Sequence, residues 1–503
     1  MLFRSGLIRG PGAPARTAAP HNGAMFEPDH RPSPEPAADP AAVLRGAGST
    51  LTEQLAQHYA ERIRQRLLTT GARLPSVREC ARRHGVSPHT VVAAYDQLLA
   101  QGLVEARRQR GFFVRAPREA TPAPARHATP ATPPVDATAL IRGMFAGVGD
   151  RPAPGLGTLP PDWLDLPLLA SALRRAMVQA DPVAALQYGD PAGDPRLRQA
   201  LSVRLAEVGV RATAAQVITA NGATHALDIV SRTLLAPGDA VLVDEPAWAV
   251  EYARLTQLGV RLLPVPRTLD GPDLGVMRAL VQAHRPRMYV TVSVLHNPTG
   301  TSLSLSHAHQ VLQLAEANDF WLVEDDTYAH LAPPHLPRLA ALDGLRRTLY
   351  VSGFSKILSP GWRVGYMAVP PALVERLVDT KLLGALTTPA VLEQAVALCL
   401  EQGSLRRHAE RVVQRLDAAR QRAVQLAEAH GCRFVTPPAG LFGWVDTGTD
   451  TEALAQVMHD DGWLLAPGHL FHARRQPGTL MRINFATAQD ARFWRAYAKA
   501  LKE

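Results

Sequence analysis

The chain has 503 residues, of which 46% are hydrophobic and 20% charged, the balance of a globular protein large enough for more than one domain. Its apolar runs all fall short of the roughly 20 residues that cross a bilayer, so we expect no membrane attachment. The formal net charge is +9, and the three cysteines (Cys80, Cys399 and Cys432) have no metal-ligand spacing. We therefore expect reduced cysteines, no metal site and a cytoplasmic location.

Residues 1–48 are rich in proline, alanine and glycine, a composition that predicts a disordered N-terminal tail. The first twenty residues are rich in arginine and alanine and poor in acids, as in a transit peptide, but they lack the apolar core of a secretory signal. We favour a tail, or a true start at Met25 in place of Met1.

The next segment, residues 49–115, holds much of the positive charge. Between Leu51 and Arg115 there are eleven arginines and five acidic residues, so about two thirds of the net excess lies in about an eighth of the chain. This concentration favours a polyanionic partner, although basic faces are often merely solvated.

Three helices are predicted in this segment. Thr50 and Glu53 form a capping box before an apolar helical face that recurs every four residues: Leu51, Leu55, Tyr59, Ile63 and Leu67. A second helix is capped by Ser76 and ends at Gly85, and a third has Ser87 as its N-cap and Pro88 in its first position. The short "HGVS" connection predicts a helix-turn-helix, and "LVEARRQRGFFV" predicts two strands around a basic turn, a wing.

A helix-turn-helix must offer side chains to base edges and cations to phosphates. The alternative is a small helical domain with a solvated basic surface. The stretch "LPSVRECARRHGVSPHTVVAAYDQLLAQGLVEARRQRGFFV" resembles the GntR family of winged-helix repressors. The resemblance and the charge pattern together give these candidate DNA-binding residues: Ser76, Arg78, Ser87, His89, Thr90, Arg107, Arg108, Arg110 and Gly111. Pro88 and His89 depart from residues common in the family's recognition turn, so the operator sequence stays open.

Residues 116–149 are dense in proline and alanine and predict an extended linker. Its core, "APREATPAPARHATPATPPVDATA", could reach on the order of 70 Å at about 3.1 Å per residue. From residue 150 to 503, helical patterns alternate with short apolar runs such as "AVLVDEP" and "FWLVEDDTY". This alternation predicts an α/β domain with a largely parallel sheet.

Lysine is rare in this chain: only four of the 54 basic residues are lysines, and Lys356 lies mid-chain in "YVSGFSKILSPGWRVGY". A lysine amine can lose its proton and attack a carbonyl, whereas a guanidinium stays protonated. Lys356 is therefore a candidate nucleophile, with a stray surface lysine as the alternative.

Other patches could hold a planar, phosphorylated heterocycle. Ala223 and Thr224 follow a glycine at a predicted strand-to-helix turn, a possible phosphate cradle, although most such turns are only turns. Trp248 could lie flat on a ring, with a core position as the alternative. Asn297 in "LHNPTG" and Asp325 in "VEDDTY" end strands, and a buried carboxylate needs a cationic partner such as a protonated pyridine nitrogen.

Together these patches resemble the fold-type I aminotransferases, which bind pyridoxal 5′-phosphate (PLP), over residues 150–500. The resemblance implies that Lys356 forms the Schiff base, Asp325 pairs with the pyridinium nitrogen and Trp248 stacks on the ring. It implies that Asn297 and Tyr328 reach the ring's 3-oxygen and that the phosphate is held by Ala223, Thr224, Ser355, Arg363 and the partner subunit's Tyr188. Arg482, in "LMRINFA", matches an arginine that clamps a substrate carboxylate.

One position departs from this pattern. Three residues before Lys356 the family commonly carries a phosphate-binding hydroxyl, and here the residue is Gly353. We expect cofactor binding to be weaker there, or to be sustained by Ser352.

A winged helix-turn-helix, a proline-rich tether and an aminotransferase-like body, in this order, resemble the MocR-type GntR regulators. The resemblance implies a PLP-dependent regulator that binds a double-stranded DNA operator as a head-to-tail homodimer, with an amino compound or PLP itself as effector. The rival hypothesis is a working aminotransferase that carries a DNA-binding module. The effector, the target genes and activation versus repression stay open.

Overall fold

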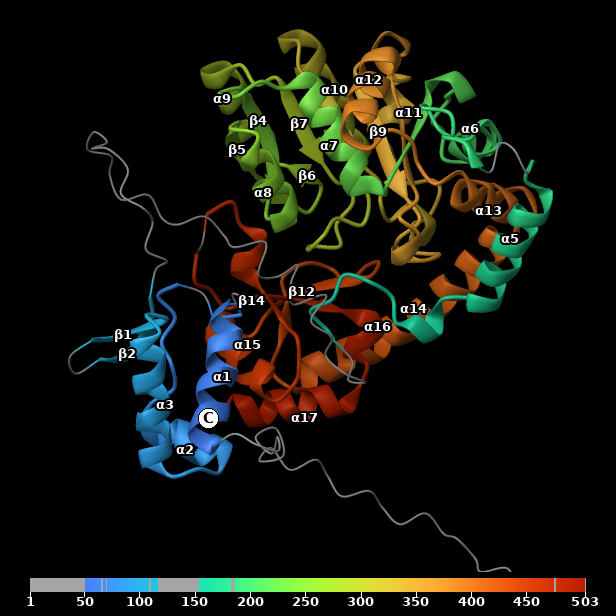
Figure 1. Cartoon of the computed structure of the whole chain (residues 1–503). Helices are drawn as coiled ribbons and strands as arrows, with labels where there is room; N and C mark the ends of the chain where they lie inside the picture. The colour runs from blue at the N-terminus through green and yellow to red at the C-terminus, as the bar shows by residue number, and fades with distance from the viewer. Residues whose placement is uncertain are drawn as a thin grey trace, which may run out of the picture.

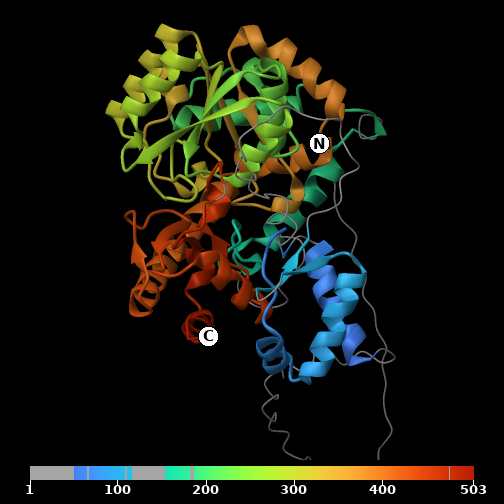
Figure 2. The same cartoon turned by 90° about the vertical axis from the view of Figure 1, so that its left-hand side faces the viewer.

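The computed structural model describes residues 50–64, 67–68, 70–107, 110–115, 153–181, 186–474 and 476–502, which form two bodies (Figures 1 and 2). The expected tail at 1–48, the expected linker at 116–149 and Arg108 of the wing lie outside these residues. Within the described part of the chain, no helix has the length and apolarity to cross a membrane.

The first body consists of three helices and a two-stranded antiparallel sheet: α1 (Leu51–Arg64), α2 (Val77–His84), α3 (Pro88–Ala100), β1 (Val104–Arg107) and β2 (Gly111–Val114). The predicted caps are confirmed. The Ser76 and Ser87 side chains accept hydrogen bonds from the third residues of α2 and α3, and Gly85 ends α2 with a φ of 63°. Each cap satisfies a backbone N–H that has no partner inside its helix.

The apolar face predicted for α1 is correct at its centre and wrong at its ends. Leu55 and Tyr59 are fully buried, but Leu51 is 49% exposed because it starts the helix. The helix ends at Arg64, before Leu67, and Leu68 is the buried leucine of the following turn.

The second body is built on an eight-stranded sheet in the order β3-β10-β9-β8-β7-β4-β5-β6. Its central strands β5, β4, β7, β8 and β9 are parallel, as predicted, whereas β10 runs antiparallel to both neighbours. The strands are β3 (Val217–Ala220), β4 (Ala240–Glu245), β5 (Arg261–Thr268), β6 (Gly271–Pro272), β7 (Met288–Thr291), β8 (Trp321–Asp325), β9 (Thr348–Gly353) and β10 (Gly365–Ala368).

Helices cover both faces of this sheet. Val241 and Val243 of β4 face the cluster formed with α7 (Ala223–Leu234), α8 (Ala249–Gln257) and α12 (Val374–Ala385). Leu242, between them, faces the opposite cluster, which includes α9 (Leu274–His284), α10 (Leu305–Asn318) and α11 (Leu339–Asp343). Burial on both faces explains why the strands read as continuous apolar runs.

The rest of the second body includes the long helix α14 and a four-stranded antiparallel sheet in the order β11-β12-β14-β13 (Figure 1). We call the unit formed by this sheet with α15, α16 and α17 the small subdomain. The remaining elements are α5 (Leu166–Gln179), α6 (Pro195–Glu207), α13 (Ala390–Glu401), α14 (Ser404–Ala429), β11 (Arg433–Phe434), β12 (Phe442–Asp446), α15 (Thr451–Asp460), β13 (Ala466–Pro467), β14 (Leu480–Asn484), α16 (Phe485–Ala488) and α17 (Ala491–Ala500).

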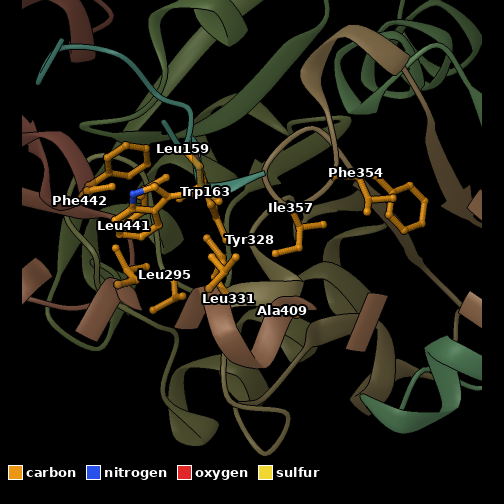
Figure 3. Close-up of a cluster of buried hydrophobic side chains, with 14 of the residues drawn as sticks. Leu159, Trp163, Leu295, Tyr328, Leu331, Phe354, Ile357, Ala409, Leu441 and Phe442 are labelled. Carbon is orange, nitrogen blue, oxygen red and sulfur yellow. The ribbon is translucent and has the colours of Figure 1, made fainter. Parts of the chain in front are cut away.

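One large apolar cluster joins these parts. Figure 3 shows some of its members, among them Trp163, Tyr328, Phe354 and Phe442, which come from segments far apart in the sequence. The rings of Tyr328 and Phe442 meet edge to face with their centroids 5.6 Å apart. This cluster fixes the small subdomain against the ends of β8 and β9.

The first body contacts the small subdomain through Asp460 at the end of α15. Asp460 pairs with Arg62 of α1 and, at 2.5 Å, with Arg83 of α2. The Asp460 and Arg62 side chains are 5% and 7% exposed, so this contact is removed from water.

Candidate functional site

A pocket lies where the parallel strands β4, β7, β8 and β9 end, the usual place for a ligand in such a sheet. It brings together ten of the eleven residues predicted for the cofactor and the effector. These are Ala223, Thr224, Trp248, Asn297, Asp325, Tyr328, Ser355, Lys356, Arg363 and Arg482.

Lys356 lies three residues beyond β9, facing this pocket. Burial, together with the positive charge of Arg482, lowers the pKa of its amine to about 8, against the opposing effect of Asp325. An amine with this pKa is partly deprotonated at neutral pH, which a nucleophile requires.

Asp325 ends β8 and faces the same pocket. Burial raises the pKa of its carboxyl to about 6, although Thr327 donates both its backbone N–H, at 3.0 Å, and its hydroxyl to one carboxylate oxygen. A desolvated carboxylate of this kind favours a cationic partner in the pocket.

A phosphate-sized cradle is formed at the turn from β3 to α7. Gly222 caps α7 with a φ of 82° and a ψ of 167°, and the N–H groups of α7 begin at Ala223. Arg363 reaches back to this turn, donating to the Asn221 carbonyl at 3.0 Å and to the Ser355 hydroxyl at 3.4 Å. A helix start with an adjacent guanidinium is an anion site.

The expectation that Ser352 could sustain phosphate binding is wrong. Its hydroxyl is fully buried and donates to the Asp326 carbonyl at 2.8 Å. Gly353 is the residue that lies beside the cradle, since a side-chain carbon there would be 3.4 Å from the Ala223 nitrogen. Successive residues of a strand face opposite sides, so Ser352 cannot replace a hydroxyl at 353.

Arg482, on β14, is 1% exposed and is enclosed by the rings of Trp248, Phe442 and Phe471 at 5.5, 4.4 and 5.0 Å. Its Nη1 donates to Asn297 Oδ1 at 2.9 Å. Burial lowers the pKa of the guanidinium to about 10, and the group stays charged at neutral pH. The Arg482 charge is thus fixed in direction and faces Lys356 across the pocket.

Tyr188 stands apart from the pocket. It is 79% exposed, in a loop whose next residue, Gly189, lies against Thr388 and Ala390. Leu383 and Leu386, just before that contact, are 92% and 50% exposed. The structure therefore places Tyr188 on the surface, with two exposed leucines shortly before the segment that Gly189 contacts.

The predicted DNA-binding residues that the structure describes are accessible to solvent. Ser76, Arg78, Ser87, His89, Arg107, Arg110 and Gly111 are exposed, and Thr90 is half-buried. Arg107 is partly engaged, because it pairs with Glu105 at 2.8 Å and lies over the Phe113 ring.

Sequence reasoning missed several residues whose positions depend on the fold. Gly157 lines the pocket between Lys356 and Arg482, and its only sequence signal was an unassigned "GLG" before two prolines. Thr327 supports Asp325. Arg73 lies at the base of the wing, with its Nε 3.4 Å from where a side-chain carbon of Gly111 would be. Nothing in the sequence distinguishes it from the other ten arginines of this segment.

Comparison with known proteins assigns both bodies. Residues 161–498 match the family model for aminotransferase class I and II, and residues 51–114 match the bacterial regulatory proteins of the gntR family. The chain belongs to the aminotransferase class I and II family. With the gntR module, a DNA-binding domain, in front of that body, it has the organisation of the MocR-type GntR regulators.

Individual relatives match most of the chain. The chain is 28% identical to "Uncharacterized HTH-type transcriptional regulator YisV" of Bacillus subtilis over 78% of this chain and 84% of that protein. It is 29% identical to "Probable rhizopine catabolism regulatory protein MocR" of Rhizobium meliloti over 87% and 90%. Among solved structures, the α-aminoadipate aminotransferase LysN of Thermus thermophilus, complexed with N-(5′-phosphopyridoxyl)-L-leucine, is 26% identical with a TM-score of 0.66, covering 72% of this chain and 94% of LysN.

Proposed function

We propose that this chain is a PLP-dependent transcriptional regulator that senses an amino compound in its aminotransferase-like body and responds through its gntR module. One observation carries the proposal: a single chain holds a DNA-binding module and a pocket in which Lys356, Asp325 and two arginines converge. With DNA as its partner, the protein would act in the cytoplasm, and this location is part of the proposal.

The residues present fit PLP at each of its functional groups. When bound, PLP supplies an aldehyde to which either a lysine amine or a ligand amine can attach, one replacing the other. Lys356, with its lowered pKa, would hold the aldehyde carbon. Asp325, whose pKa burial raises, would hold the protonated ring nitrogen, and the positive charge of that nitrogen would favour the ionised carboxylate.

The other two groups of PLP also have candidate partners. Asn297 and Tyr328 would donate to the ring oxygen, with Trp248 against the ring face. The phosphate would lie at the start of α7, where the Ala223 N–H, the Thr224 hydroxyl, Ser355 and Arg363 gather. The absence of a hydroxyl at Gly353 removes one donor from this set.

The ligand class follows from Arg482. A buried guanidinium whose terminal nitrogens face Lys356 would pair with a carboxylate, so we propose an amino compound that carries a carboxylate. A ligand that joins both groups gains affinity from each only if its amine and carboxylate lie close together, as in an α-amino acid.

The exposed apolar patch supports a homodimer. We take Tyr188, Leu383 and Leu386 as one patch, because all three are large and exposed and Gly189, the residue after Tyr188, lies against Thr388 and Ala390, just beyond the two leucines in sequence. Such patches commonly mark interfaces. A head-to-tail pair of subunits would cover the patch and bring the partner subunit's Tyr188 to the phosphate site. The two gntR modules of the dimer would then bind two DNA half-sites.

The decisive experiment measures DNA binding and turnover on the same preparation. Duplexes selected by the PLP-loaded protein from a random pool serve as the DNA probe, and each common L-amino acid is added with and without 2-oxoglutarate. The proposal expects at least one amino acid to change DNA affinity fivefold or more without sustained keto-acid production. Lys356→Ala should lose the near-visible PLP absorbance and this response while still binding DNA, whereas Lys499→Ala, an exposed lysine, should behave as wild type.

The rival functions give different results. Many turnovers per site with unchanged DNA affinity would make the protein an aminotransferase with an attached module, for which the intact Lys356 and Arg482 pair is a favourable sign. A change in DNA affinity on adding PLP alone, with no further response to amino acids, would make PLP the effector.

A further inference from the structure

Lys381 of α12 is a buried lysine that the pocket does not use. Its side chain is fully buried, it does not line the pocket, and its amine donates to the Thr219 hydroxyl of β3 at 3.2 Å. An ammonium group in the interior is unfavourable unless charged or hydrogen-bonding groups surround it. The groups around Lys381 therefore indicate its role.

Lys381 belongs to a chain of buried polar side chains, which we call the lysine network. The Thr219 hydroxyl contacts the Thr388 hydroxyl at 3.0 Å, and the Thr388 hydroxyl donates to one carboxylate oxygen of Glu393. The other carboxylate oxygen of Glu393 accepts from the Asp194 backbone N–H at 2.7 Å. The four side chains from Lys381 to Glu393 are each at most 5% exposed, so the network joins two opposite charges inside the protein.

The network holds one end of the loop at residues 187–194, which we call the tyrosine loop because it carries Tyr188. The Thr219 N–H donates to the Ala192 carbonyl at 2.9 Å. Gly193 leaves no room beside Thr219, since a side-chain carbon at Gly193 would be 2.0 Å from the Thr219 hydroxyl. This end of the loop is therefore packed directly on the hydroxyl that accepts from the lysine amine.

The start of the tyrosine loop also lies against the network. A side-chain carbon at Gly189 would be 3.7 Å from the Thr388 carbonyl oxygen. Burial lowers the pKa of the Lys381 amine to about 8, and the negative charges of Glu393 and Asp190 oppose this shift. The charge of the lysine is thus partly balanced by a carboxylate of the loop itself.

The Tyr188 side chain is 79% exposed, in contrast to the groups that hold its loop. The loop is anchored on buried residues while its tyrosine stays accessible to another subunit. Thr219 also ties the loop to β3, the strand that leads into the phosphate cradle at Ala223. The tyrosine of each subunit is therefore fixed relative to the cradle strand of the same subunit.

We propose that Lys381 is a positioning residue that acts across the dimer: by holding Thr219 against the tyrosine loop, it places Tyr188 for the phosphate site of the other subunit. This inference rests on the proposed function, in which Tyr188 crosses to that site. Without the lysine, the Thr219 hydroxyl loses a donor and the Glu393 carboxylate is buried without its cation, so the loop loosens. The altered subunit keeps its own pocket residues, and the other subunit loses affinity for PLP.

Hybrid dimers of the full-length protein test this inference, because they separate the subunit that binds PLP from the subunit that supplies Tyr188. Each hybrid joins two differently tagged chains, one of which carries Lys356→Ala, so only the other chain gives near-visible PLP absorbance. In the first hybrid, Lys381→Met is in the chain that keeps Lys356. In the second, Lys381→Met and Lys356→Ala are in the same chain.

The reference hybrid carries Lys356→Ala in one chain and no other change. We expect the first hybrid to bind PLP as the reference does, and the second to bind it about tenfold more weakly, the effect of losing one hydrogen bond to a charged group. Weaker binding in the first hybrid alone would show that Lys381 acts within its own subunit. That result, or equal affinities in all three hybrids, would overturn the inference.

Tyr188→Phe, placed in the same two arrangements, separates failure of the inference from failure of the proposed function. If Tyr188→Phe weakens PLP binding only in the second arrangement and Lys381→Met does not, the crossing tyrosine is correct and only the role of Lys381 is wrong. If the tagged chains do not associate, or the reference hybrid shows no PLP absorbance, the proposed dimer or the PLP site is wrong, and the inference falls with it.

Hydrogen exchange in the protein without PLP gives a second readout. Lys381→Met should speed exchange in peptides covering 187–194 about threefold or more, because the Asp194 N–H loses its fixed acceptor. Thr388→Val breaks the network at an uncharged residue and should give the same exchange and the same hybrid asymmetry, even where Lys381→Met fails to fold. Lys499→Met, an exposed lysine that pairs with Asp461, is the matched control. Wild-type exchange in Thr388→Val would contradict the positioning role.

Discussion

Lys356 and Asp325 are perturbed in opposite directions by the same cause, their removal from water. Burial lowers the pKa of the lysine amine to about 8 and raises that of the carboxyl to about 6, so each group is shifted toward its neutral form. The neutral amine is the form that attacks an aldehyde, whereas the carboxyl would have to regain its charge to pair with a cation.

The Lys356 shift predicts how the rate of covalent PLP capture by unliganded protein depends on pH. Only the neutral amine attacks, so the rate should rise nearly tenfold from pH 6 to 7 and level off above about pH 8. Arg482→Gln should move the plateau to higher pH, because the Arg482 charge helps to lower this pKa. Stopped-flow absorbance checks both results, and a rate that still climbs from pH 9 to 10 would indicate an unperturbed lysine.

The Asp325 shift predicts a pH effect on the stability of the unliganded protein. The folded-state pKa of about 6 lies above the unfolded value near 3.8, so the native state binds the proton more tightly. Stability should therefore fall as pH rises from about 4 to 6, by on the order of 2–3 kcal/mol in this site alone.

Thermal melts between pH 4 and 8 measure this effect. Asp325→Asn should lack the decrease, and PLP loading should remove it from the wild type. Thr327→Val removes the hydroxyl hydrogen bond that lowers this pKa, and the decrease should then extend to higher pH. A melt profile shared by wild type and Asp325→Asn would show that the carboxyl is not perturbed.

At the scale of elements, the turn from β3 to α7 depends on a glycine. Gly222 has a φ of 82° and a ψ of 167°, a region that is open essentially to glycine alone. A side-chain carbon there would also lie 2.5 Å from an Arg363 nitrogen. The turn brings the start of α7 and this guanidinium to one point.

Gly222→Ala should therefore weaken PLP binding by more than tenfold and cost about 1–3 kcal/mol of stability from backbone strain. Gly478→Ala is the matched control, because Gly478 has a φ outside the left-handed region and open space around it. Fluorescence titration with PLP and thermal melts give both quantities. A PLP affinity within twofold of wild type would exclude this turn as the phosphate cradle.

The wing carries a prediction for DNA binding. Arg110→Ala removes an exposed cation beside Gly111, so affinity should fall similarly for different DNA sequences and the slope of log K against log salt should decrease by about 1. Arg433→Ala, an exposed arginine of the second body, should leave the slope unchanged. Titrations at several salt concentrations test this, and an unaltered slope for Arg110→Ala would remove the residue from the interface.

A residue's role can be predicted from the sequence when that role depends on neighbours along the chain. Caps such as Ser76 and Ser87, and site residues such as Asp325 that follow a strand, are set by neighbours in the chain and were predicted. Gly157 owes its place in the pocket to a segment that Asn484 holds from a strand more than 300 residues away, which no local pattern indicates. Ser352 shows a different limit, since strand alternation would have excluded it had the strand boundaries been certain.

At the scale of the whole molecule, Asp460 holds the first body against the second. Asp460→Asn removes its charge and leaves Arg62 buried beside a neutral group, which is strongly unfavourable. We expect the first body to separate and the radius of gyration in small-angle scattering to increase. Asp461→Asn is the control, because that carboxylate meets Lys499 of α17 at 3.5 Å. Unchanged scattering from Asp460→Asn would show that this pair does not hold the bodies together.

The position of Asp460 has a mechanical consequence. Helix α15 packs on β13, and β13 pairs with β14, the strand that carries Arg482. The gntR module and Arg482 are thus both attached to the small subdomain. A rotation of the small subdomain by a few degrees around a bound molecule would carry the gntR module with it. Because displacement grows with distance from the rotation axis, a small movement at the pocket would become a larger movement at the DNA.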